Sequence, residues 1–362
     1  MRQYPRLIVD MKKLRGNVRA VNKLCENAGI FPAFVIKGCN GIPEAIRAAA
    51  EEGAEMIGSS RLEQLKRAKE IAPDIERLML RIPAPSEAAD VVEVADISLV
   101  SSLEALEFLD AEAGKQHKKH QVILMADLGD LREGFWETDE LVQAAIYAEQ
   151  KADNLILAGV GTNLGCYGAI DVTVEKMDEL VQVAETVESA IGRKLKYISG
   201  GGTTSIPRVL AKDMHPRVNM LRIGEGWLSA RDLEDIWHCT IPGVEKNAFI
   251  LEAEISEVRD KASYPQGVIK CDAFGNVPTY EDRGIRKRAI ASAGKVDYGY
   301  PEMLEPLEEG IEVLGASSDH TLLDIQEAKR ELKIGDIVKF GMKYANTVFV
   351  TGREDIAKNI IE

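Results

Sequence analysis

One lysine stands where a buried strand is expected to end. The apolar run Phe31–Ile36 is followed directly by Lys37 and then by the turn-forming residues Gly38–Gly41. An amine at the carboxyl end of a strand is partly removed from water, which lowers its pKa and frees its lone pair to form a Schiff base. The alternative is an ordinary lysine whose ammonium extends from the strand end into solvent. Sequence spacing alone leaves both interpretations open.

Two arginines occupy comparable places after or within later apolar runs. Arg132 follows a glycine turn in the segment Asp127–Gly134, and its guanidinium could hold a phenolate or a carboxylate. The alternative for Arg132 is an ordinary ion pair on a surface loop, which would contribute little to the stability of the fold. Arg222 lies in the segment Leu221–Gly226, where an inward side chain needs a buried anion or acceptor.

Glycine and hydroxyl residues follow two further runs. The segment Ser199–Ser205 reads Ser-Gly-Gly-Gly-Thr-Thr-Ser ahead of a helical stretch, so its N–H groups and hydroxyls could bind a phosphate. Flexible turns also use adjacent glycines. The segment Gly161–Gly168 would allow a ligand to approach closely, and it could equally be a plain turn.

The elements that carry these residues alternate between short β-branched runs and stretches of helical period. This alternation predicts a parallel sheet with crossover helices. Eight runs suggest a (β/α)8 TIM-type barrel, in which all strand ends meet on one face. A doubly wound open sheet is the alternative, but the first run lacks the Gly-x-Gly-x-x-Gly turn that would favour it. The runs are 32–36, 55–59, 77–81, 96–100, 121–126, 155–161, 196–199 and 219–223.

Past about Trp237 the pattern changes to short apolar runs separated by Gly, Pro and charged turns, without helices. We therefore expect a barrel over residues 10–236 and a C-terminal all-β domain over residues 237–362. Residues 1–9 contain Leu7-Ile8-Val9 and could add an outer strand to that domain. The predicted short runs lie at 249–251, 268–269, 289–291, 313–315, 322–323 and 337–340.

Composition narrows the class of protein. The 45 Lys and Arg against 59 Asp and Glu give a net charge of -14, which opposes binding to nucleic acid and to anionic membrane surfaces. No apolar stretch reaches the length of about 18 residues that a membrane span requires. The five cysteines are scattered and show no paired spacing, so we expect neither a disulfide framework nor a metal site. We expect a cytoplasmic protein that acts on a small molecule.

Taken together, Lys37, the two arginines and the glycine loops resemble the alanine-racemase-like enzymes of fold type III, which use pyridoxal 5'-phosphate (PLP). The resemblance covers essentially the whole chain and is closest to the ornithine racemases. The segments that carry this closer resemblance are 127–134, 161–168, Gly284-Ile285-Arg286-Lys287-Arg288 and Gly315-Ala316-Ser317-Ser318-Asp319-His320.

The resemblance implies a role for each matched residue. Lys37 matches the lysine that forms the Schiff base with PLP and then acts as one of two racemising bases, and Arg132 matches the arginine that contacts the phenolic oxygen. Arg222 matches an arginine on the pyridine nitrogen, which keeps that nitrogen unprotonated and favours racemisation over transamination. The other cofactor contacts implied are Asn163 against the ring, with Ser199, Gly201, Thr203, Thr204 and Gly224 around the phosphate.

Two positions depart from the family pattern. The alanine racemases place a second catalytic base, a tyrosine from the partner subunit, at the position of Lys295. We expect Asp319 or His320 to replace it, because imidazole is a common general acid–base and both residues lie in a matched motif. Met125 stands where some alanine racemases carry a carbamylated lysine, so Arg132 must be oriented in another way. The other candidates for the second base are Cys166, Tyr167, Tyr298 and Tyr300.

The resemblance therefore implies a homodimeric PLP-dependent racemase that completes each site across the subunit interface. A basic amino acid, with ornithine first, is the expected substrate, and its distal ammonium would need a carboxylate such as Asp272, Asp297 or Asp319. The alternatives are an alanine- or serine-type racemase, a non-catalytic PLP-carrier protein, and a decarboxylase or aldolase of the same fold. The carrier proteins lack a long β domain, which this chain has.

Overall fold

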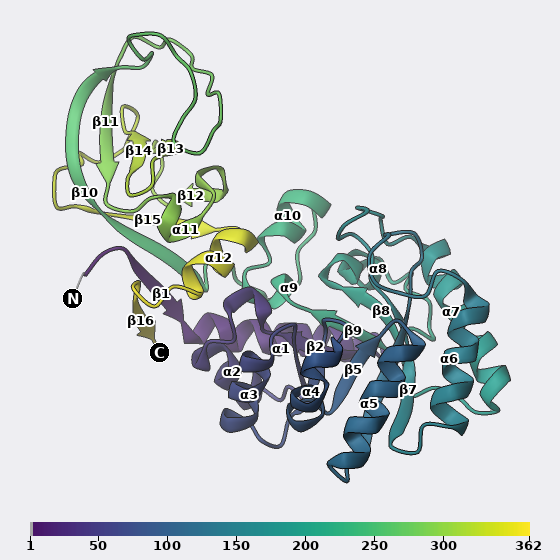
Figure 1. Ribbon diagram of the computed structural model, residues 1–362. Coiled ribbons are helices and arrows are strands. Elements are labelled where there is room, and N and C mark those ends of the chain that lie inside the picture. Colours follow the sequence, from purple (N-terminus) through teal and green to yellow (C-terminus); the bar gives the residue numbers. More distant parts are fainter. Residues whose placement is uncertain (1–2) are drawn as a thin grey trace. The chain divides into compact units, whose positions relative to one another are not determined.

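The computed structural model describes residues 3–362, and the chain divides into two units (Figure 1). One unit is Lys13–Glu245, and the other joins the N-terminal residues through Lys12 to Lys246–Glu362. Residues 1 and 2, which belong to the predicted outer segment 1–9, lie outside the described residues.

Eight parallel strands close a barrel in the first unit. Each strand pairs with the next, and the last strand pairs with the first. Every strand overlaps one of the runs predicted from the sequence, so the predicted (β/α)8 barrel is confirmed. The strands are β2 (Phe31–Val35), β3 (Met56–Ser59), β4 (Glu76–Met79), β5 (Ile97–Val100), β6 (His120–Ala126), β7 (Leu155–Thr162), β8 (Tyr197–Gly202) and β9 (Met220–Ile223).

Helices connect these strands, and local capping residues mark where they begin and end. The Ser102 hydroxyl accepts a hydrogen bond from the Ala105 N–H at the start of α5, and Thr173 accepts one from Lys176 at the start of α7. Gly192, with φ of +75°, ends α7 in the left-handed region. The helices are α1 (Met11–Asn27), α2 (Pro43–Glu51), α3 (Leu62–Ile71), α4 (Ala88–Val94), α5 (Leu103–Lys115), α6 (Thr138–Gln150), α7 (Val174–Ile191), α8 (Ile206–Ala211), α9 (Glu225–Leu228) and α10 (Arg231–Trp237).

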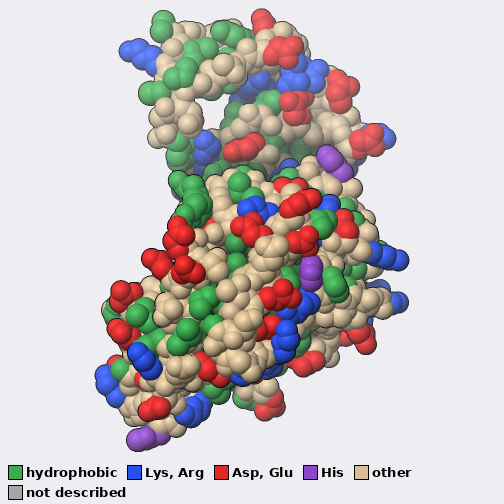
Figure 2. All heavy atoms as spheres, turned by 90° about the vertical axis from the view of Figure 1, so that its right-hand side faces the viewer, with side chains coloured by type: hydrophobic (Ala, Val, Ile, Leu, Met, Phe, Trp, Pro, Cys, Tyr) green, Lys and Arg blue, Asp and Glu red, His purple; other side chains and the backbone are tan. Residues whose placement is uncertain are grey.

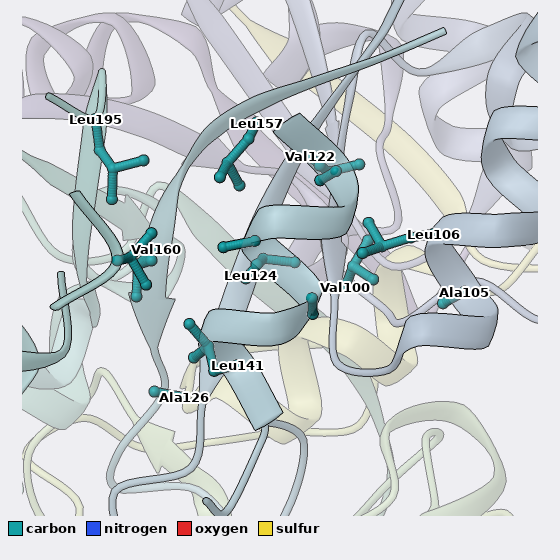
Figure 3. Packing of buried hydrophobic residues seen from close by; sticks show 14 of the residues in the cluster. Val100, Ala105, Leu106, Val122, Leu124, Ala126, Leu141, Leu157, Val160 and Leu195 are labelled. Carbon is teal, nitrogen blue, oxygen red and sulfur yellow. The ribbon is translucent and has the colours of Figure 1, made fainter. Parts of the chain in front are cut away.

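The strands are apolar on both faces, as a barrel covered by helices requires. Along β6, Val122, Leu124 and Ala126 join the core shared with the helices, while Ile123 and Met125 join a separate cluster with residues of the other strands. Figure 3 shows Val122 and Leu124 among side chains from neighbouring elements, including Leu106 and Leu141. The alternation follows from the two-residue period of a strand.

The second unit is built on a mostly antiparallel sheet in the order β12-β15-β10-β11-β14-β13. The N-terminal strand β1 (Arg6–Asp10) pairs antiparallel with β10 and parallel with the C-terminal strand β16 (Ala357–Ile361). A sheet domain separate from the barrel is therefore confirmed. The remaining strands are β10 (Phe249–Ala262), β11 (Ile285–Ala291), β12 (Leu304–Pro306), β13 (Glu312–Ala316), β14 (Thr321–Asp324) and β15 (Ile337–Met342).

Two local expectations for this unit differ from the structure. The run Val268–Ile269 lies in the irregular segment 263–284 rather than in a strand, and Val268 is 90% exposed. Pro265 and Pro278 lie in the same irregular segment, and neither can donate a hydrogen bond to a strand ladder. The unit also contains two short helices, α11 (Lys295–Tyr298) and α12 (Tyr344–Thr351). In α12 the hydroxyls of Thr347 and Thr351 donate to carbonyls one turn earlier, which accommodates threonine in a helix.

Acidic and basic side chains are interspersed over the face of the molecule in Figure 2. None of the helices among residues 3–362 combines the length and the apolar character needed to cross a bilayer.

A buried histidine in the barrel makes stability depend on pH. His120 is 1% exposed beside the buried Ser98 hydroxyl, at 2.8 Å from its Nε2, and burial lowers the pKa of His120 from 6.5 to about 4. The unfolded chain binds a proton at His120 more readily than the folded chain does. The contribution of His120 to folding stability is therefore complete above its unfolded pKa and is lost as the pH falls toward its folded pKa. We expect the free energy of unfolding to fall by about 2 kcal/mol through this group as the pH decreases from about 7 to about 5.

Urea denaturation of the wild type and of His120→Gln across this pH range measures the effect. The difference in unfolding free energy between the two proteins should shrink toward acid pH, since only the wild type carries the histidine. Parallel pH profiles would contradict the assignment.

Candidate active site

Lys37 lies directly after β2, in the short 3-10 turn Lys37–Cys39. Asn40 follows with φ of +50°, and the Gly41 N–H returns to the Ile36 carbonyl at 2.9 Å. Nη1 of Arg67, on α3, donates to the carbonyls of Asn40 at 3.2 Å and of Gly41 at 2.8 Å. The turn that carries the amine is therefore tied to the neighbouring helix.

The surroundings of Lys37 suit an amine that reacts in its neutral form. Its side chain is still accessible to solvent. The protein atoms packed around it nevertheless remove part of its hydration, and this desolvation is the largest cause of its lowered pKa. Cys166 and Glu133 oppose this effect, while the charges of Arg132 and Arg222 add to it. These four side chains come from three different strand ends, so barrel closure gathers them around the amine.

Arg222 is buried on β9, as the sequence predicted for an inward arginine. Its Nη1 donates to Ser199 Oγ at 2.5 Å, and its Nη2 donates to the Thr162 carbonyl at 2.7 Å and to Asn163 Oδ1 at 3.5 Å. These partners are uncharged. Burial lowers the pKa of Arg222 to about 10, and the Glu133 charge acts in the opposite direction. The arrangement holds a cationic donor at the barrel mouth without neutralising it through a direct ion pair.

The loop after β6 holds Arg132 through a set of internal contacts. Asp127 Oδ1 accepts from the N–H groups of Gly129 at 2.9 Å and Leu131 at 3.1 Å. Gly134 has φ of +142°, and a Cβ there would lie 2.3 Å from the Asp127 nitrogen, so the loop closes only with glycine at this position. Arg132 lies between these fixed points.

A buried aspartate joins this loop to the loop after β7. Asp130 is 1% exposed, and its carboxylate accepts from the N–H groups of Cys166 at 3.3 Å and Tyr167 at 3.0 Å. Within the second loop, Asn163 Nδ2 donates to Cys166 Sγ at 3.0 Å. Asn163 therefore connects Arg222 to the free thiol of Cys166.

The glycine and hydroxyl residues form a second part of the mouth. Oγ1 of Thr203 accepts from the N–H groups of Gly224 and Gly226, each at 3.2 Å, so two backbone donors converge on one oxygen. Thr204 donates to the Leu164 carbonyl at 3.1 Å. Gly201, two residues after Ser199 in β8, has φ of +103°, a conformation that favours glycine.

Asp319 and His320 lie in the other unit, on the turn between β13 and β14. Both residues are exposed. The His320 N–H donates to Ser317 Oγ at 3.2 Å, and the His320 carbonyl accepts from the Ser317 N–H at 2.9 Å. A Cβ at Gly294 would lie 2.2 Å from the Ser318 carbonyl oxygen, so glycine lets the neighbouring segment approach this turn.

Other candidates named from the sequence in this unit have structural partners. Tyr298 is fully buried, its hydroxyl contacts Thr321 Oγ1 at 2.6 Å, and burial raises its pKa to about 12. Asp297 is buried and accepts from the Gly294 N–H at 2.8 Å. Lys295 Nζ lies 3.6 Å from Asp272 Oδ2. A buried tyrosine and a buried helix-capping aspartate are poor candidates for contact with a substrate.

Sequence reasoning gave no role to Glu133 or Asp130. Glu133 Oε2 lies 2.7 Å from Arg132 Nε. Both acidic residues lie in the segment 127–134, which the sequence analysis named. The sequence around a carboxylate in a polar loop does not show which residue it contacts. Adjacency of Glu133 to Arg132 was the only available signal.

Comparison with known proteins agrees with this geometry. The family model described as alanine racemase, N-terminal domain, matches residues 9–230. The chain is 35% identical to an ornithine racemase of Acetoanaerobium sticklandii over 99% of this chain and 100% of that protein. It is 33% identical to a lysine racemase of Thermotoga maritima over 94% of each.

Solved structures share the fold at lower identity. An alanine racemase from Streptomyces lavendulae superposes with a TM-score of 0.77 at 17% identity, covering 100% of this chain and 98% of that one. A D-threonine aldolase from Filomicrobium marinum gives a TM-score of 0.75 at 14% identity, covering 99% and 91%. The matched model and the two full-length relatives show that the chain belongs to the alanine racemase family.

Proposed function

We propose that the protein is a PLP-dependent racemase of a basic amino acid, with ornithine as the first substrate to test. The observation that carries the proposal is the accessible Lys37 amine of lowered pKa, surrounded by Arg132, Arg222 and Glu133 at the barrel mouth. The relatives named ornithine racemase and lysine racemase, each matched over nearly its full length, support a substrate with a distal ammonium.

The residues present fit PLP. Arg222 offers a buried cationic donor whose direct partners are neutral, which suits the ring nitrogen. The N–H groups of Gly224 and Gly226 converge on Thr203 Oγ1, and this loop, with Thr204 and Gly201, suits a phosphate. Ser199 is fully buried and supports Arg222. Asn163 would lie against the ring, and Arg132 would bind the phenolic oxygen. When bound, PLP withdraws electrons from the substrate's α-carbon and so makes its proton removable.

The chain's own residues then handle the proton. Lys37 would bind the cofactor and afterwards take or return the α-proton on one face, and its lowered pKa favours the neutral amine that this role requires. Arg132 would hold the substrate carboxylate. Arg222 keeps its own proton, because even a lowered pKa of about 10 leaves it cationic, and so leaves the ring nitrogen without one. Limited electron withdrawal favours return of the proton over transamination.

For the second base we propose His320, with Asp319 as its partner in the same turn. Both side chains are exposed, whereas Tyr298 is buried. We further propose a cytoplasmic homodimer in which each site is completed across the interface. The free cysteines fit a reducing compartment, and family membership supports the dimer.

Borohydride reduction followed by peptide mapping tests the cofactor assignment. With PLP, the label should appear on Lys37, and Lys37→Ala should lose both the label and racemisation, by at least about 10³-fold. Lys66→Ala, at an exposed position of α3, is the matched control and should behave like the wild type.

Chiral chromatography with L-ornithine, L-lysine and L-alanine gives the substrate. Faster turnover of the two basic amino acids is expected, and retained configuration of all three would contradict the proposal. Label on Lys37 without any racemisation would favour a PLP carrier instead.

Hydrogen exchange in heavy water tests the second base. If His320 serves one face, His320→Gln should abolish racemisation but still exchange the α-hydrogen of one enantiomer, because Lys37 remains. Nuclear magnetic resonance of D- and L-ornithine measures this asymmetry, with Asp319→Asn and Cys166→Ser tested in parallel. An asymmetric defect in Cys166→Ser, with normal activity in both other variants, would place the second base on the loop after β7.

A further inference from the structure

The barrel mouth is rich in positive charge. Lys37, Arg132 and Arg222 act on one another electrostatically, and Glu133 is the carboxylate that acts on both Lys37 and Arg222. Basic side chains that stand close together repel one another when they are charged, so a negative group among them lowers the electrostatic cost of assembling the site.

Glu133 makes a specific contact within this group. Its Oε2 lies 2.7 Å from Arg132 Nε, and its side chain is 14% exposed, against 40% for Arg132. Within residues 3–362, the Arg132 guanidinium forms an ion pair with Glu133 and makes no other polar contact. The two terminal nitrogens Nη1 and Nη2 are therefore left to bind something other than the protein.

Anchoring through Nε has a geometric consequence. A guanidinium is planar, so a carboxylate paired with Nε restricts how its terminal nitrogens can point. The backbone around the pair is also held, by the Asp127 carboxylate on one side and by Gly134 on the other. A group fixed before its ligand arrives loses less freedom when the ligand binds.

We propose that Glu133 is the positioning residue of the site: it orients Arg132 through Nε so that Nη1 and Nη2 face a carboxylate or phenolate oxygen. The inference deepens the proposed racemase function and rests on it. Met125 is fully buried on β6 and offers no charge that could take this role. Glu133 acts through Arg132 and needs no contact with the substrate.

Two ligands without an α-amine separate this role from direct recognition of the substrate's distal ammonium. Valerate carries only a carboxylate, and 5-aminovalerate adds the distal ammonium of ornithine, while neither has an α-amine that could react. Their dissociation constants for the PLP-loaded protein are measured by spectral titration in the wild type, Glu133→Gln and Glu133→Ala.

If Glu133 positions Arg132, Glu133→Ala should weaken both ligands equally, by about tenfold. Glu133→Gln keeps an acceptor and should lose less. In an Arg132→Ala background, Glu133→Ala should have no further effect, because the group through which it acts is gone. Glu137→Ala, an exposed carboxylate at the start of α6, is the matched control and should leave both constants unchanged.

Loss confined to 5-aminovalerate would overturn the proposal in favour of Glu133 as the ammonium receptor. Additive losses in the Arg132→Ala background would also overturn it. Failure of the racemase function would show separately, as a wild type whose Lys37 is not labelled after borohydride reduction. Circular dichroism and PLP titration of each variant confirm that the fold is retained.

Discussion

Pairing of the first barrel strand with the last is the contact on which the site depends. Ala33 of β2 lies opposite Arg222 of β9, although the two residues are far apart in the chain. Because the strands are parallel, closing this seam brings the turn with Lys37 beside the strand end that holds Arg222. The same closure places the loops after β6 and β7 on the same rim. An open sheet would separate these ends, and no local feature of either strand could restore their proximity.

Electrostatics explains why the rim needs internal acceptors. A guanidinium buried as deeply as Arg222 would destabilise the fold if its donors were unsatisfied. Ser199, Thr162 and Asn163 satisfy them without charge, which leaves the cation available to a ligand. Lys37 responds to the same environment, since burial and neighbouring cations shift it toward its neutral form. One set of contacts thus stabilises the barrel mouth and sets the reactivity of its amine.

Loops are fixed at this rim by carboxylates that do no chemistry in the proposed mechanism. Asp130 joins the loops after β6 and β7, and Asp127 closes the turn before Arg132. In the sheet unit, Asp297 plays a comparable part by holding the Gly294 N–H beside the turn of His320. Charged side chains near the candidate residues are therefore divided between those that hold the backbone and those left for a ligand.

Local sequence patterns were enough to predict the eight barrel strands, the placing of Lys37 after the first of them and the inward position of Arg222. These features follow from local periodicity, because a strand buried on both faces reads as an apolar run wherever it lies. Three other features became visible only in the folded chain: Asp130 joins two loops, Tyr298 is buried, and Val268 is exposed in an irregular segment. The tertiary structure also decided that Glu133 holds Arg132. Each of these outcomes depends on which neighbour satisfies or covers a side chain, and that neighbour is set by long-range packing that no local pattern records.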